Sequence, residues 1–91
     1  MRVSNNFILR EIAGEYLLVP VGAAAASFNG LITLNETAYT IFRALAEDHS
    51  AEELVQLVVS EYDVDAGTAR ADVDEFVQQL RQIGALVENG L

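Results

Sequence analysis

Residues 29–45, NGLITLNETAYTIFRAL, change from strand to helix within a few positions. The first part, residues 31–34, is rich in β-forming residues and predicts a short strand. Asn35 is a suitable helix N-cap, because its side-chain oxygen can accept from free N–H groups of the first turn. Apolar residues then recur at the spacing of a helix with one buried face, at Ala38, Ile41, Phe42 and Leu45. We therefore predict mainly strands before this junction and helices after it.

Two further strands are predicted upstream, over residues 7–12 (FILREI) and 16–21 (YLLVPV), with a turn at Ala13-Gly14. Together with residues 31–34 they would form a three-stranded antiparallel sheet. The intervening loop, residues 22–29, is made of small residues, and its alanine run could form a brief helical turn.

Three helices are predicted downstream. The first covers residues 36–47, and Ser50 with Glu53 forms a capping box at the start of the second, whose buried side carries Leu54, Val55, Val58 and Tyr62. Asp65 is expected to cap the third, residues 66–83, which should end at Gly84. Its core stripe is Ala69, Val73, Phe76, Leu80 and Ile83. The tail, residues 85–91, could fold back through Leu86 and Val87. Strands followed by helices indicate an α+β class similar to a winged helix-turn-helix.

Composition limits the classes of partner. The chain has 91 residues, enough for one domain, and 52% of them are hydrophobic, which argues against disorder. The net charge of −9, with five arginines and no lysine, opposes binding to nucleic acids and anionic membranes. There is no cysteine, no signal-peptide pattern and no apolar run long enough to cross a bilayer. We expect a cytoplasmic protein.

Four phrases resemble the PqqD-like family: REIAGEY (10–16), NGLITLNET (29–37), EYDVD (61–65) and DVDEFVQQLRQIGAL (72–86). The resemblance extends over residues 7–87 and implies one peptide-recognition domain over residues 1–91. It implies a protein that binds the leader of a ribosomally synthesised precursor peptide and presents the core to a modifying enzyme, often a radical S-adenosylmethionine enzyme. In the family, the leader adds as a strand to the third strand, in a groove bordered by the third helix.

The candidate peptide site combines this strand with one side of the third helix. A strand left open at a sheet edge offers unpaired N–H and C=O groups to a peptide. We expect the peptide along Leu31, Ile32, Thr33 and Leu34, against Arg70, Val73, Val77 and Arg81. When the residues are considered without the family resemblance, two alternatives remain open. The loop at residues 22–29 could cover the strand edge, and Arg70 could simply pair with Asp74 on an exposed flank.

No catalytic or metal-binding pattern is present, so we expect no enzyme activity, metal or cofactor. His49 is a lone histidine in an interhelical turn, without a second histidine or a cysteine. Asp63, Asp65 and Asp72 lack the spacing of a calcium loop, and helix capping explains them better. The competing functions are a DNA-binding winged helix and a structural or dimerisation module.

We predict that the protein does not bind duplex DNA specifically, because the third helix carries Asp72, Asp74 and Glu75 against two arginines. A mobility-shift titration should show no complex at physiological salt with excess competitor DNA. A shifted band that survives both conditions would contradict this prediction.

Overall fold

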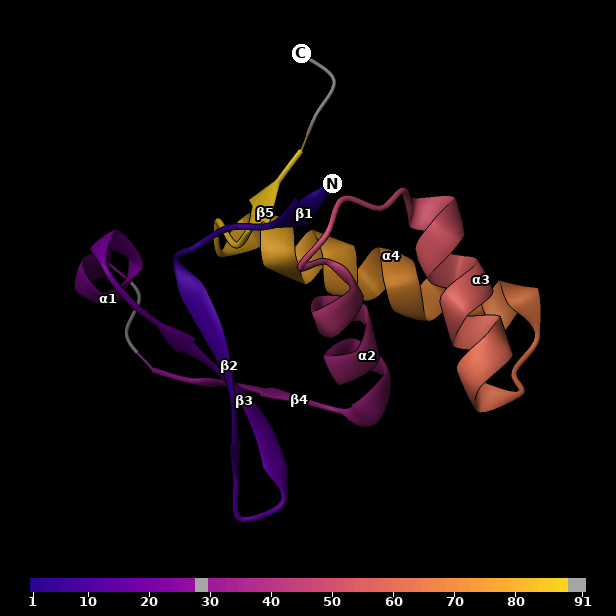
Figure 1. The fold of residues 1–91 in the computed structure, drawn as a ribbon, viewed down its shortest axis with the longest axis horizontal. Coiled ribbons are helices and arrows are strands. Elements are labelled where there is room, and N and C mark those ends of the chain that lie inside the picture. Colours follow the sequence, from indigo (N-terminus) through magenta and orange to yellow (C-terminus); the bar gives the residue numbers. More distant parts are fainter. Residues whose placement is uncertain (28–29, 89–91) are drawn as a thin grey trace.

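A three-stranded antiparallel sheet occupies one end of the computed structural model, and the three long helices occupy the other (Figure 1). The structure describes residues 1–27 and 30–88. The sheet has the order β2-β3-β4, and a two-stranded sheet pairs β1 with β5. The elements, in chain order, are β1 (Arg2–Val3), β2 (Phe7–Ile12), β3 (Glu15–Pro20), α1 (Ala23–Ser27), β4 (Ile32–Leu34), α2 (Glu36–Ala44), α3 (Ala51–Tyr62), α4 (Ala66–Gln82) and β5 (Leu86–Val87). The predicted α+β class is confirmed.

The hairpin between β2 and β3 has a two-residue turn. The register pairs Ile12 with Glu15, and both turn residues have positive φ, 53° at Ala13 and 82° at Gly14. This is the pattern of a type I′ turn, whose twist matches that of the flanking strands. The turn projects away from the helices (Figure 1), and Ala13, with its left-handed conformation, is exposed.

The predicted helix caps are present. Asn35 Oδ1 accepts a hydrogen bond from the Ala38 N–H (2.8 Å), and Asp65 Oδ1 accepts one from the Thr68 N–H (2.7 Å). In the capping box, the Glu53 N–H donates to Ser50 Oγ (3.1 Å) and the Ser50 N–H donates to Glu53 Oε1 (2.8 Å). These bonds satisfy backbone donors that have no partner within a helix, so each helix starts at a defined residue.

The core lies between one face of the sheet and the helices α2, α3 and α4. The predicted stripe on α4 is confirmed for its buried members, whereas Ile83 is only partly buried. Val77, which we expected in the peptide site, is 4% exposed and belongs to the core. The side chains with the largest fully buried volumes are Leu18, Ile41, Leu45, Leu54, Leu80, Val58 and Val73.

A hydrogen bond from a tyrosine hydroxyl connects α2 to α3. The Tyr62 hydroxyl, at the end of α3, donates to the Glu36 C=O (3.0 Å) in the first turn of α2. Because that bond uses the only phenolic proton, Thr40 Oγ1 is the donor in its 2.5 Å contact with the same hydroxyl oxygen. The start of α2, and with it the end of β4, is therefore held by the neighbouring helix.

The two-residue strand β1 was not predicted. It pairs with β5, with Val3 opposite Leu86, and the Val3 N–H donates to the Leu45 C=O (2.8 Å). The expectation that the tail folds back through Leu86 and Val87 is confirmed, and residues 89–91 of that tail lie outside the described residues. A strand of two residues has no periodicity that a sequence pattern could reveal.

Some boundaries differ from the prediction. The alanine run forms α1, while residues 28 and 29 of the predicted loop lie outside the described residues. α2 ends at Ala44 rather than at residue 47, because the last predicted turn is taken up by a cap at Leu45. β4 begins at Ile32, and Leu31 precedes it with 58% of its surface exposed.

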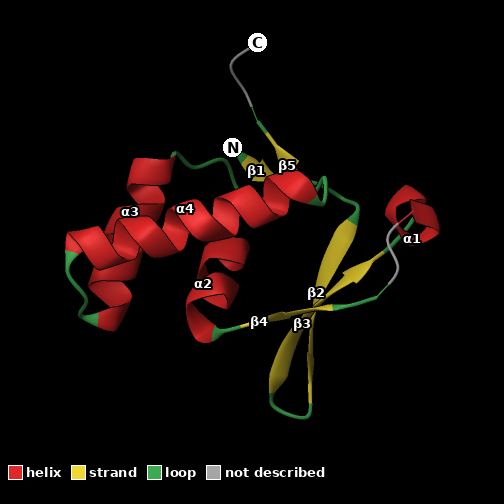
Figure 2. Ribbon diagram, turned by 180° about the vertical axis from the view of Figure 1, so that it is seen from behind, coloured by secondary structure: helices red, strands yellow, loops and turns green. Residues whose placement is uncertain are grey.

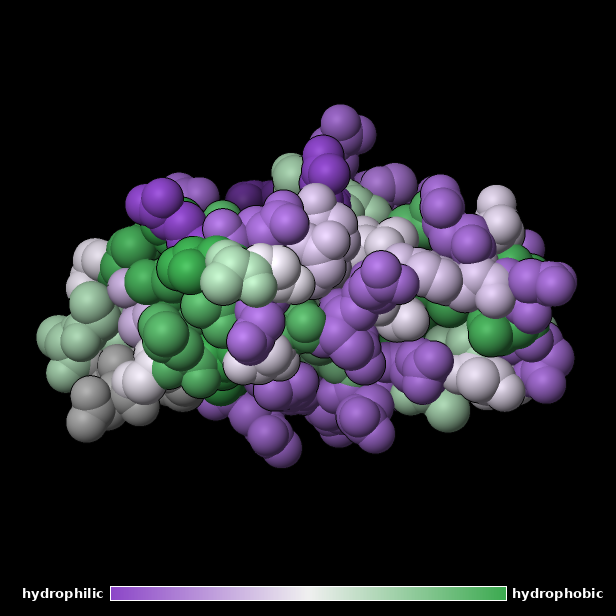
Figure 3. Space-filling view, turned by 90° about the horizontal axis from the view of Figure 1, so that it is seen from below, coloured by the Kyte–Doolittle hydropathy of each residue, from purple (hydrophilic) through white to green (hydrophobic). Residues whose placement is uncertain are grey.

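The outer face of the sheet is not covered by the three long helices (Figure 2). Ile8 and Ile12 of β2 are 37% and 56% exposed. From below, hydrophobic atoms gather over the sheet end of the molecule, and hydrophilic ones dominate the centre (Figure 3).

Among the described residues, none of the helices has the length and apolar character needed to cross a membrane.

We predict that Ala13→Asn stabilises the protein by about 0.5–1 kcal/mol, because Asn tolerates the left-handed conformation better than Ala does. Urea denaturation with a constant m-value would measure the change. The matched control is Ala71→Asn at an exposed position inside α4, where the same substitution should destabilise, since Asn is the poorer helix former. Equal effects at both sites would contradict the prediction.

Candidate functional site

The free edge of β4 is the main feature of the site. β4 pairs with β3 on one side, and no segment of residues 1–27 or 30–88 pairs with its other edge. The described part of the predicted loop, including α1, therefore leaves this edge without a strand partner. An open edge offers its backbone hydrogen-bonding groups to an incoming strand.

The pairing of β2 with β3 fixes which backbone groups of β3 face β4. Just beyond the ladder, the Val21 N–H donates to the Asn6 C=O (2.8 Å), so these two residues form a hydrogen-bonded pair. Bonded and non-bonded pairs alternate along an antiparallel ladder. It follows that Leu18 and Tyr16 do not bond to β2, and that their N–H and C=O groups face β4.

The same alternation then defines the free edge. Leu18 is paired with Ile32 and Tyr16 with Leu34, so the backbone groups of these two β4 residues face β3. Thr33 lies between them, and its N–H and C=O therefore face away from the sheet. Thr33 is the residue of β4 that can bond a new strand.

A groove runs beside this edge, between β4 with the start of α2 and one side of α4. Its volume is about 100 Å³, which suits one side chain. The residues that line it are Thr33, Leu34, Asn35, Thr37, Ala38, Asp72, Glu75, Phe76 and Gln79. Leu34 and Phe76 are each 5% exposed and make an apolar floor, whereas Asp72 and Glu75 are exposed at its rim.

The structure does not bring the predicted helix residues to this groove. Val73 and Val77 are buried in the core, at 0% and 4% exposure. At about 100° per residue, Arg70 and Arg81 point to the side of α4 opposite Asp72. The helical layout predicted the stripe correctly, but which flank of the stripe meets β4 depends on how α4 crosses the sheet.

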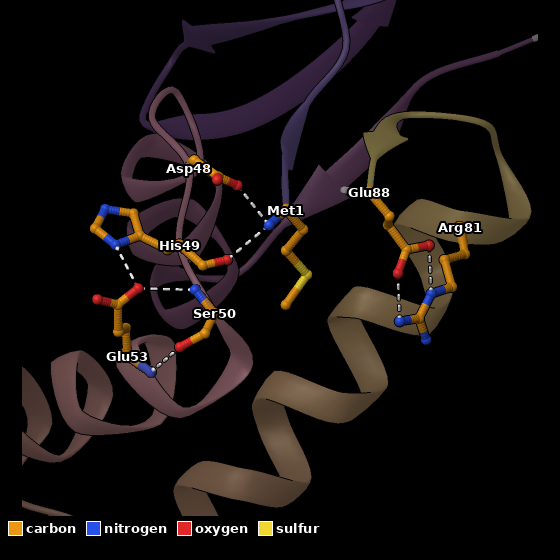
Figure 4. Close-up of polar contacts among 7 residues, drawn as sticks. All are labelled: Met1, Asp48, His49, Ser50, Glu53, Arg81 and Glu88. Carbon is orange, nitrogen blue, oxygen red and sulfur yellow. Dashed lines mark hydrogen bonds and ion pairs between the residues drawn. The ribbon is translucent and has the colours of Figure 1, made fainter. Parts of the chain in front are cut away.

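Both arginines have acidic partners away from the groove. Arg70 pairs with Glu52 of α3, not with Asp74 as the alternative interpretation proposed. Arg81 makes a two-pronged contact with Glu88, from Nε (2.9 Å) and Nη2 (2.8 Å), beside β5 (Figure 4). The arginines thus hold α4 to neighbouring segments of the same chain.

The remaining candidate residues have structural contacts. His49 Nδ1 lies 3.4 Å from Glu53 Oε1, next to the capping box, and the Asp48 carboxylate lies 2.6 Å from the Met1 nitrogen (Figure 4). Asp65 is an N-cap, and Asp63 ends α3 in a left-handed conformation. Within residues 1–27 and 30–88, no three acidic or histidine side chains lie close enough to hold a metal ion.

An open third strand of the main sheet beside the last long helix is the arrangement that the resemblance implied. The sequence matches the family described as coenzyme PQQ synthesis protein D (PqqD) over residues 15–86, most of the chain. The chain belongs to the PqqD family. No curated protein shows significant sequence similarity to this family member.

Two solved structures are similar to this PqqD family member. One is TbiB1 in complex with the TbiA(beta) leader peptide, with 23% identity and a TM-score of 0.76 over 100% of both chains. The other is lasso peptide synthetase B1 complexed with the leader peptide, with 24% identity and a TM-score of 0.74 over 96% of each chain. At this level of identity, the likeness shows a shared fold.

We predict that Arg81→Gln raises the pKa of Glu88. Hydrogen bonds from the Arg81 guanidinium hold the pKa of this carboxyl below its ordinary value. The pair therefore stabilises the fold above the ordinary pKa of Glu, and this contribution is lost as the pH falls through the lowered value. An NMR titration of the Glu88 carboxyl should show a higher midpoint in the variant. Arg70→Gln is the control and should leave that midpoint unchanged, and an unchanged midpoint in both variants would count against the ion pair.

Proposed function

We propose that the chain binds the leader of a ribosomally synthesised precursor peptide, which adds as a fourth strand to the free edge of β4. The chain then presents the core of that peptide to a modifying enzyme, such as a radical S-adenosylmethionine enzyme, and is itself not catalytic. The observation that carries the proposal is the outward-facing backbone of Thr33 beside the groove under α4.

Three findings support this proposal. The chain belongs to the PqqD family, and its two structural relatives were each solved with a leader peptide. The open edge supplies the main-chain bonds from which β-strand addition gains affinity, and the groove supplies a pocket for side-chain selection. The groove also lies next to an edge that carries neither proline nor lysine, the residues with which proteins commonly block strand addition.

The added strand would place alternate side chains toward α4. The peptide residue opposite Thr33 points to the outer face of the sheet, as Thr33 does. Its two neighbours in the peptide lie opposite Ile32 and Leu34 and point to the inner face. Of these two β4 residues, Leu34 lines the groove. The leader residue opposite Leu34 would therefore enter the groove beside α4. The proposed site keeps Ile32, Thr33 and Leu34 and replaces the predicted α4 residues with Asp72, Glu75, Phe76 and Gln79.

We predict that Thr33→Pro weakens peptide binding by roughly fivefold or more while the protein stays folded. Proline removes the outward donor, worth about 1 kcal/mol, and its ring obstructs the incoming strand. Ile32→Pro should instead unfold the protein, because the lost N–H bonds to β3. Thr33→Val is the matched control, since it keeps the backbone donor and should bind normally. Isothermal titration with a leader peptide that binds the wild type, together with thermal melts, would measure these effects.

The position of the peptide can be tested separately by amide chemical-shift mapping with the same leader peptide. The shifts should be concentrated in β4 and on the Asp72, Glu75 and Gln79 side of α4. Shifts confined to α3 and the turn at Asp48 and His49, with β4 unaffected, would show that the proposed site is wrong.

A further inference from the structure

The groove beside β4 is acidic. Asp72 and Glu75 at its rim are carboxylates, and the other residues that line it are neutral. Within residues 1–27 and 30–88, neither carboxylate takes part in an ion pair or a hydrogen bond. A leader side chain that enters the groove therefore meets two negative charges that the described chain does not neutralise.

The cations of the chain lie elsewhere. Arg70 and Arg81 are paired with Glu52 and Glu88 on the far side of α4. Arg43 of α2 donates to the Tyr39 hydroxyl (3.0 Å), and its guanidinium carbon lies 5.6 Å from the centre of the Tyr39 ring. None of the five arginines, Arg2 and Arg10 included, lines the groove. The field at the groove is thus set by its own carboxylates.

The polarity of the groove also changes from its floor to its rim. Its floor, at Leu34 and Phe76, is apolar, and its charges are at the rim. Lysine and arginine fit such a profile, because their methylene stems pack on apolar surface while the charged head reaches the rim. A volume of about 100 Å³ suits one such stem.

From these observations we infer that the groove selects a lysine or arginine in the bound peptide, at a position whose side chain points toward α4. This inference rests on the proposed function and specifies the peptide that β4 would accept. The basic residue lies next to the peptide residue opposite Thr33, because only the neighbours of that residue point to the inner face of the sheet, where the groove lies. Asp72 and Glu75 then act as specificity residues, with no part in main-chain pairing.

The test is selection from a displayed library of random peptides of roughly ten residues, about the upper length of protein strands. The library is panned in parallel on the full chain, on the double variant Asp72→Asn/Glu75→Gln, and on Asp74→Asn. Asp74 lies on the same helix but lines a different hollow, with Val77 and Arg81, so its variant controls for loss of charge on α4.

We expect the wild type and Asp74→Asn to enrich peptides with lysine or arginine at one fixed position, and the double variant to lose that preference. For a selected peptide, replacing the basic residue with norleucine should weaken binding to the wild type by up to about fivefold per carboxylate, as exposed ion pairs do. The same replacement should have little effect on the double variant, and the difference should shrink at high salt.

Each contrary outcome has a distinct meaning. Peptides that shift β4 amides but show no basic preference, or keep that preference with the double variant, would overturn the inference and leave the proposed function standing. Selected peptides that bind away from β4 in all three proteins, or a selection that yields no binding peptide, would contradict the proposed function and this inference with it.

Discussion

The hydrogen bond from the Ala38 N–H to Asn35 Oδ1 defines the point where β4 ends and α2 begins, and the site depends on it. Because the strand enters the helix without a loop, the direction of β4 is set by the position of α2. That position is fixed in turn by the Tyr62 hydroxyl on the Glu36 C=O and by the buried side chains of Ile41 and Leu45. The free edge is therefore held in a defined orientation relative to α4, which a strand at the end of a long loop would not be.

The alternation of the antiparallel ladder determines which residue of the open edge can bond to a new strand. In the observed register, the backbone groups of Ile32 and Leu34 face β3, so Thr33 is the one residue of β4 that turns both backbone groups outward. Its flanking residues are bonded to β3 and face the core side. A shift of the register by one residue would exchange these roles and send Leu34 to the outer face. The burial of Leu34 thus stabilises the pairing register that defines the free edge, as well as the core.

Much of the fold could be predicted because its signals are local. The caps at Asn35, Ser50 and Asp65 depend on residues within one helical turn, and the core stripe of α4 depends on its own periodicity. The composition of the site could not be predicted in the same way. β1 is too short for a pattern, and the flank of α4 that meets β4 depends on helix crossing, which no single segment encodes. Of the predicted site residues, Thr33 and Leu34 line the groove, whereas Leu31, Ile32, Arg70, Val73, Val77 and Arg81 do not.

The placement of the arginines has an electrostatic consequence for the groove. Arg70 and Arg81 each face a carboxylate of a neighbouring segment, so their charges are compensated on the side of α4 away from β4. At physiological salt, an exposed charge is screened within roughly 8 Å, and its effect is mostly local. Asp72 and Glu75 consequently dominate the potential over the groove, in a chain whose net charge of −9 has the same sign. For the peptide that we propose, local contact and long-range attraction would then act in the same direction, since an acidic surface speeds the encounter with a basic peptide.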